Sequence, residues 1–205
     1  MGDVILFTLL GIGGCPFYFF SVRTGFIICS ILCLLLFGYN IVLKMMRAIS
    51  IAFMAACAVV AIMLTRNVWN TVLLTASLYY ALAWVIPLLL SVIPEVVLLM
   101  IVGLVGLVFG LCGNLWVLFP CGAFCLTCLM SSMLQGKVRP YVYSIIAAVL
   151  VLVSLFVYIH PEPDGTYVKI AKVFCYSACL TYPLVSLYIL LNRLIKGSFD
   201  EPKNQ

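Results

Sequence analysis

The segment VVLLMIVGLVGLVFGLCGNLWVLF, residues 96–119, decides the fold class, because it runs without a single charged side chain. The hydrocarbon core of a bilayer is about 30 Å thick, and about 20 residues of α-helix cross it. The segment is long enough to do so. It therefore predicts a helix that is solvated by lipid.

The rest of the chain has the same character. Of its 205 residues 66% are hydrophobic and only 8% are charged, and the mean hydropathy is +1.30. Water-soluble domains carry about 25% charged residues and about 45–50% apolar ones. The composition therefore excludes a soluble domain and predicts an integral, multi-pass membrane protein with the lipid bilayer as its first partner.

Charges and Pro/Gly clusters divide the chain into eight apolar runs, which predict an all-α, polytopic transmembrane helix bundle of about eight spans with short loops. The sixth run is short enough to be a half-helix, so seven spans plus a half-helix is the alternative. The runs are 4–22, 25–43, 48–64, 71–93, 96–119, 121–134, 141–160 and 168–195.

Residues 1–196 are predicted to form a single transmembrane helical domain, followed by a polar C-terminal tail at 197–205. With eight spans the Lys and Arg residues divide seven against four between the two sides, and cytoplasmic loops collect such residues. Both termini are therefore predicted in the cytoplasm, while the host membrane stays open. The seven are Lys44, Arg47, Lys137, Arg139, Arg193, Lys196 and Lys203; the four are Arg23, Arg66, Lys169 and Lys172.

Polar and aromatic residues inside the apolar runs are candidates for a mid-bilayer binding site, because a polar group facing lipid is costly unless it meets a partner or a cavity. Pro87 and Pro183 fall within two runs and would kink their helices there. The candidate substrate-binding residues are Tyr79, Tyr80, Trp84, Pro87, Asn114, Lys172, Tyr176, Tyr182 and Pro183. Gly103, Gly106, Gly110 and Gly113 instead favour a seam of close helix packing.

Ten cysteines raise the possibility of redox chemistry. Cys125 and Cys128 form a Cys-x-x-Cys pair, and Cys121 precedes Cys125 by about one helical turn, so the three are candidate redox residues. Small apolar packing is the simpler interpretation of cysteines in membrane helices. No catalytic residue, metal site or cofactor is predicted.

Three functions follow from these patterns. The first is a small-solute permease or a carrier-associated membrane subunit with the mid-bilayer site described above. The alternative is a non-catalytic scaffold, trafficking or complex-assembly subunit, whose partners are other membrane subunits or copies of itself. The second alternative is a membrane thiol-disulfide oxidoreductase using Cys125 and Cys128. A non-enzymatic role is favoured, and a nucleic-acid partner is excluded because the basic residues do not cluster on one face.

Overall fold

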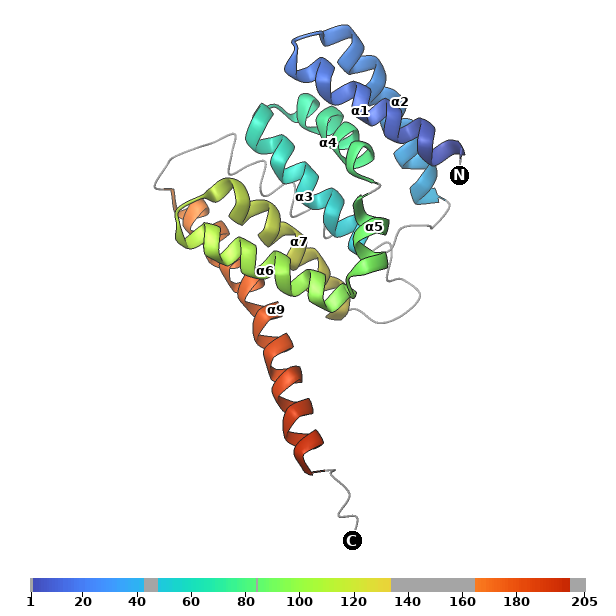
Figure 1. The fold of residues 1–205 in the computed structure, drawn as a ribbon. Coiled ribbons are helices and arrows are strands. Elements are labelled where there is room, and N and C mark those ends of the chain that lie inside the picture. Colours follow the sequence, from blue (N-terminus) through green and yellow to red (C-terminus); the bar gives the residue numbers. More distant parts are fainter. Residues whose placement is uncertain (1, 43–47, 84, 134–164, 200–205) are drawn as a thin grey trace.

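The computed structural model of the chain describes residues 2–42, 48–83, 85–133 and 165–199 (Figure 1). These residues form eight helices, and so the predicted all-α class is confirmed for the described part of the chain. The helices are α1 Gly2–Phe19, α2 Arg23–Val42, α3 Ala48–Thr65, α4 Val68–Leu82, α5 Val85–Val92, α6 Glu95–Leu111, α7 Leu115–Met133 and α9 Thr166–Phe199.

Only some of these helices are long and apolar enough to cross a bilayer. Two meet that requirement, Leu115–Ser132 in α7 and Thr166–Ile195 in α9. A third span results if α4 and α5, which meet at an angle of 44°, are taken together as one broken span. The described helices thus supply two or three candidate spans, fewer than the eight predicted. The predicted run 141–160 lies outside the described residues.

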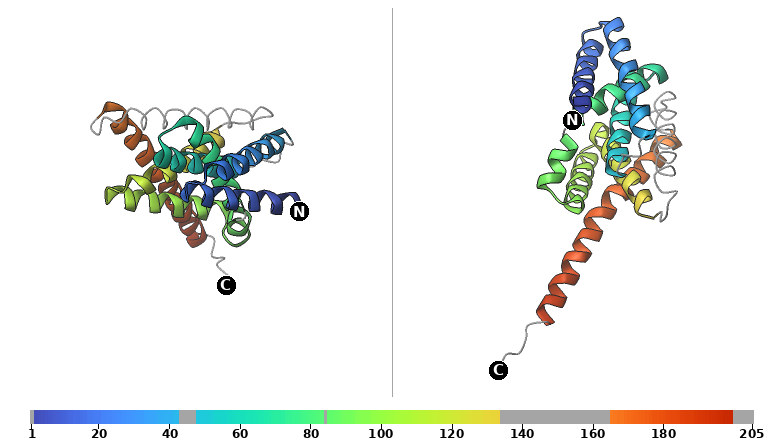
Figure 2. Two further views of the ribbon diagram at one scale, coloured as in Figure 1. Left: turned by 90° about the horizontal axis from the view of Figure 1, so that it is seen from above. Right: turned by 90° about the vertical axis from the view of Figure 1, so that its right-hand side faces the viewer.

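The helices are arranged as hairpins that pack on one another (Figures 1 and 2). Helices α1, α2 and α4 pack together and form what we call the N-terminal group, while α6, α7 and α9 form the C-terminal group. Helix α3 lies between the groups and contacts α4 on one side and α7 on the other. The core of the molecule therefore continues from one group to the other through α3.

The boundary between α6 and α7 lies inside the predicted run 96–119, so this run is not one helix. The boundary also corrects the prediction that a half-helix follows Pro120. The chain turns at Gly113, whose φ of +80° suits glycine, and the N–H of Asn114 donates to the carbonyl of Phe109 at 2.9 Å. The Asn114 side chain then caps α7 by accepting from the N–H of Trp116 at 3.1 Å. Helix α7 continues through Pro120 as 19 helical residues. The half-helix alternative is wrong, because a glycine turn and an asparagine cap define the boundary.

Helix α9 is the longest described helix, at 34 residues, and it runs through Pro183. Its first half packs on α6 and α7, whereas its second half extends beyond the other described helices (Figures 1 and 2). It ends at Phe199, so the first three residues of the predicted tail are helical. The second half of α9 exposes apolar side chains throughout, including Leu187, Leu190 and Leu194.

Candidate functional site

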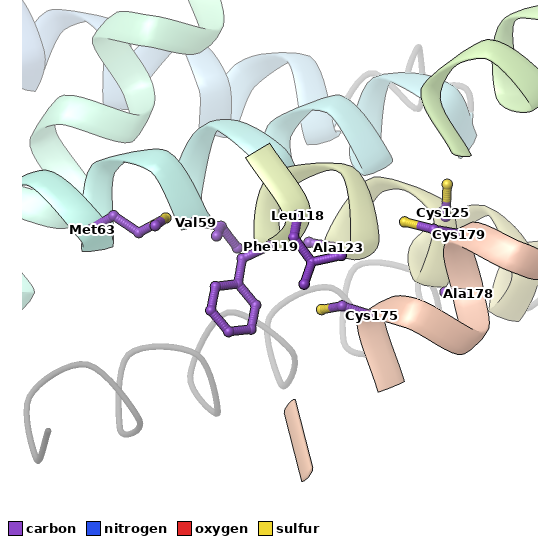
Figure 3. Packing of buried hydrophobic residues seen from close by; sticks show 9 residues of the cluster. All are labelled: Val59, Met63, Leu118, Phe119, Ala123, Cys125, Cys175, Ala178 and Cys179. Carbon is purple, nitrogen blue, oxygen red and sulfur yellow. The ribbon is translucent and has the colours of Figure 1, made fainter. Parts of the chain in front are cut away.

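The best-packed part of the C-terminal group lies where α7 meets α9 and α3. Figure 3 shows its buried side chains, with α3 and α9 contributing from either side of α7. Leu118, Cys125 and Cys179 are each 0% exposed. This cluster therefore joins helices that are distant in the sequence. It consists of Val59, Met63, Leu118, Phe119, Ala123, Cys125, Cys175, Ala178 and Cys179.

The predicted glycine seam lies directly beside this cluster. A Cβ atom added at Gly103 would lie 2.7 Å from the carbonyl oxygen of Cys179, and one at Gly106 would lie 2.7 Å from the Cys179 sulfur. A Cβ at Gly110 would lie 2.8 Å from the Tyr176 ring. Helices α6 and α9 are close only because these glycines lack side chains. The seam is confirmed for Gly103, Gly106 and Gly110, while Gly113 lies in the turn.

Three of the predicted site residues on α9 pack along this seam. The Tyr176 hydroxyl donates to the Gly110 carbonyl at 2.7 Å, which ties α9 to α6. The ring of Pro183 lies 3.1 Å from the position of a Cβ at Gly103, and Tyr182 packs against the buried clusters on both faces of α7. Lys172 is half-buried near the start of α9. Tyr176, Tyr182 and Pro183 are thus used in helix packing.

Tyr79 and Tyr80 lie in the N-terminal group. Both are buried in a cluster with Cys33 and Ala76, and their rings meet edge to face with centroids 5.4 Å apart. Tyr79 also contacts α3 through the ring of Phe53, with ring centroids 6.4 Å apart. These two tyrosines therefore belong to a different cluster from Tyr176 and Tyr182, and the structure does not bring the two pairs into one described site.

Two further predicted binding residues lie at helix ends. Asn114 is exposed and serves as the cap of α7. Pro87 is exposed in the first turn of α5. Backbone N–H groups in the first turn of a helix have no partner within the helix, so the N–H that proline lacks costs no hydrogen bond there. Trp84 lies outside the described residues. A polar residue in an apolar run therefore does not always lie inside a helix, because Asn114 occupies a turn.

The candidate redox residues separate onto two faces of α7. Cys125 is buried against α9, in the same cluster as Cys179. Cys128 is buried in a second cluster, with Ile49, Ile86 and Leu98 from α3, α5 and α6. Cys121 lies near Cys179, since both meet the position of a Cβ at Gly106. In the described part of the chain no group of three or more His, Cys, Asp or Glu side chains is arranged to hold a metal ion.

Two cavities open into the described helices. One, of about 210 Å³, lies between α3, α5, α6 and α7 and is lined by apolar side chains such as Phe53, Leu98 and Phe124. The other, of about 560 Å³, lies at the turn between α1 and α2 and is lined by Arg23, Asn70 and aromatic rings. The described linings of these cavities include none of the nine predicted binding residues.

Sequence reasoning missed two polar features. Ser30 of α2 and Ser77 of α4, both 0% exposed, share a hydrogen bond of 2.8 Å between their hydroxyls. Asn67 caps α4 by accepting from the N–H of Trp69 at 3.0 Å, as Asn114 does for Trp116 in α7. The repeated pattern Asn-x-Trp was visible in the sequence and is a usable signal for a helix start. The serine pair left no such signal.

Comparison of the chain with protein-family models, curated proteins and solved structures finds no match.

Proposed function

We propose that this chain is a multi-pass integral membrane protein that acts as a non-catalytic scaffold, holding other membrane subunits or further copies of itself. The observation that carries the proposal is the use of its intramembrane polar groups. Tyr176 bonds to the neighbouring helix α6, and the pair Ser30–Ser77 joins α2 to α4, rather than facing a shared aqueous cavity. Polar side chains used in this way join helices and fix their register.

The hydroxyl groups of threonines support the same function. Thr75, Thr127 and Thr181 each donate to the carbonyl four residues earlier in their own helix, at 2.6–2.8 Å. A hydroxyl that donates to a carbonyl of its own helix loses little free energy in lipid, because its hydrogen bond is already made. It is also not available to donate to a solute. The described polar groups therefore favour a packed bundle over a transport path.

A membrane orientation accompanies the proposal. The turns α1–α2, α3–α4 and α6–α7 lie at corresponding ends of their helices, at the upper left in Figure 1. Trp69 and Trp116 are exposed there, close in sequence to Arg66 and to the turn at Gly113. Trp and Arg concentrate at the boundary between lipid and water. We place this end at one membrane face and both chain termini at the cytoplasmic face, with about eight spans in all.

Thiol labelling tests the scaffold function. The natural cysteines provide internal standards, because Cys112 is exposed at the turn before α7 whereas Cys33 is 0% exposed. A membrane-impermeant maleimide should label Cys112 in the folded protein and leave Cys33 unlabelled, as read by peptide mass spectrometry. Tyr182→Cys and Tyr79→Cys should remain as unlabelled as Cys33. Labelling of both at the rate of Cys112 would contradict the scaffold.

A small-solute permease is the second candidate. The 560 Å³ cavity favours it, because Arg23 and Asn70 lie among aromatic side chains there and could receive a polar or anionic solute. Arg23→Gln and Asn70→Ala would abolish uptake into vesicles if this cavity begins a transport path. Unchanged solute flux in both variants, relative to protein-free vesicles, would leave the scaffold as the function.

A further inference from the structure

Two buried thiols from different helices meet inside the C-terminal group. Cys125 of α7 and Cys179 of α9 are each 0% exposed, and Figure 3 shows their sulfur atoms on adjoining side chains. Both side chains belong to the same buried cluster, and their sulfur atoms lie near each other in Figure 3. The sequence separation between them hides this pair from any search for a local Cys-x-x-Cys motif.

The backbone packing explains why the thiols are so close. A Cβ atom added at Gly122 would lie 2.5 Å from the Cβ of Cys175, so α7 and α9 are almost in backbone contact at that level. Cys125 and Cys179 follow those two residues by about one turn each, which places them together on helices that run in parallel. A Cβ at Gly106 of α6 would meet the Cys179 sulfur at 2.7 Å, so this thiol is also confined from the third side.

We propose that Cys125 and Cys179 are an oxidisable pair, in which a disulfide links α7 to α9. A peroxide is the class of oxidant that suits this buried position, because small uncharged peroxides enter apolar surroundings. The two thiols give up two protons and two electrons and form one S–S bond, while hydrogen peroxide accepts both protons and both electrons and becomes two molecules of water. A thiol reductant reverses the step.

The disulfide would change how firmly α9 is attached to α7. In the reduced protein the first half of α9 is held on α6 and α7 by packing and by the Tyr176–Gly110 hydrogen bond. Oxidation adds a covalent bond between α7 and α9 near the middle of the helix, immediately before the half that extends from the bundle. The disulfide would therefore fix the base of the extended half.

Peptide mapping tests the pair directly. Trypsin cuts after Arg66, Lys137, Lys172 and Arg193, so Cys125 lies on fragment 67–137 and Cys179 on fragment 173–193. The full chain in detergent micelles is treated with hydrogen peroxide, its free thiols are blocked with N-ethylmaleimide, and it is then denatured and digested. We expect these two fragments to be joined, to separate on reduction, and to show the Cys125–Cys179 bond in tandem mass spectra.

Single variants separate this pair from its neighbours. The joined fragments should be lost in Cys125→Ser and in Cys179→Ser and retained in Cys121→Ser, Cys128→Ser and Cys112→Ser. Tandem mass spectra of the wild-type fragments identify the bonded residues even if a variant fails to fold. Fragments that stay separate in the oxidised wild-type protein, or a bond between any other two cysteines in place of this one, would overturn the proposal.

Discussion

The N-terminal and C-terminal groups achieve close helix contact in the same way but place different chemistry at the contact. In the N-terminal group α1 presents Gly11 and Gly14 to α4, and in the C-terminal group α6 presents Gly103 and Gly106 to α9. The first contact lies beside the buried hydroxyl pair Ser30–Ser77, whereas the second lies beside the thiols of Cys125 and Cys179. Glycine therefore determines how closely two helices approach. The neighbouring side chains determine whether a hydroxyl pair or a thiol pair lies beside the contact.

The largest expected effect comes from filling the glycine contacts. Gly11→Ala would place a Cβ 2.6 Å from the backbone nitrogen of Ala81, and Gly122→Ala would place one 2.5 Å from the Cys175 Cβ. Overpacking of this kind costs about 1–3 kcal/mol, more than the roughly 1 kcal/mol that alanine gains over glycine in a helix. Both variants should lower the SDS fraction or temperature at which half of the protein unfolds in micelles.

Matched glycines with free space around them serve as controls. A Cβ at Gly38 meets no atom within 4 Å, and one at Gly13 meets only the Cys29 sulfur at 3.8 Å. Gly38→Ala and Gly13→Ala should stabilise the protein by up to about 1 kcal/mol. Equal stability changes in the Gly122→Ala and Gly38→Ala variants would show that the close contacts of α7 and α9 do not exist.

The hydroxyl pair should give an effect of similar size. Ser30→Ala or Ser77→Ala leaves one buried hydroxyl without its partner, which costs about 1–3 kcal/mol of unfolding free energy. The double variant removes both hydroxyls and should lose less than the sum of the single variants. The corresponding cycle with Cys125→Ala and Cys179→Ala should give a smaller coupling, because a thiol is a weak donor and acceptor. Equal couplings in the two cycles would remove the distinction between the groups.

A smaller loss is expected at the link between α9 and α6. Tyr176→Phe removes the hydrogen bond to the Gly110 carbonyl and should cost about 1 kcal/mol in the same unfolding measurement. Tyr188→Phe is the control on the same helix, because Tyr188 is 68% exposed and lies on the extended half of α9. If both substitutions have the same effect, the Tyr176 hydroxyl does not hold α9 in place.

The smallest effect concerns the helix caps, which the two groups share. Asn67→Ala and Asn114→Ala each remove the side-chain acceptor for the N–H of a following Trp, and each should cost about 1 kcal/mol or less. Asn67→Gly and Asn114→Gly should cost only a few tenths of a kcal/mol, since glycine is a tolerated cap. Unfolding free energies that do not distinguish alanine from glycine would argue against the caps.

The candidate site was harder to predict than the fold class. Cutting the chain at Pro120 was reasonable, because proline ends many helices, but Pro120 lies inside α7 and the turn forms at Gly113. That one misplaced boundary also made Asn114 an intramembrane polar residue instead of a cap. Tyr79 and Tyr80 lie in α4 and Tyr182 lies in α9, and no sequence pattern placed them in separate clusters.

The sequence by itself determined that the chain is helical and apolar, because 66% of its residues are hydrophobic and its polar breaks are short. It also determined the close seam at Gly103, Gly106 and Gly110, since residues three and four apart share one helix face. Only the tertiary structure decided which helix enters that seam and that Cys125 meets Cys179 rather than Cys128. Contacts between helices far apart in sequence depend on which helix faces pack together. These faces are nearly equal in hydrophobicity, so local sequence periodicity does not predict the pairing.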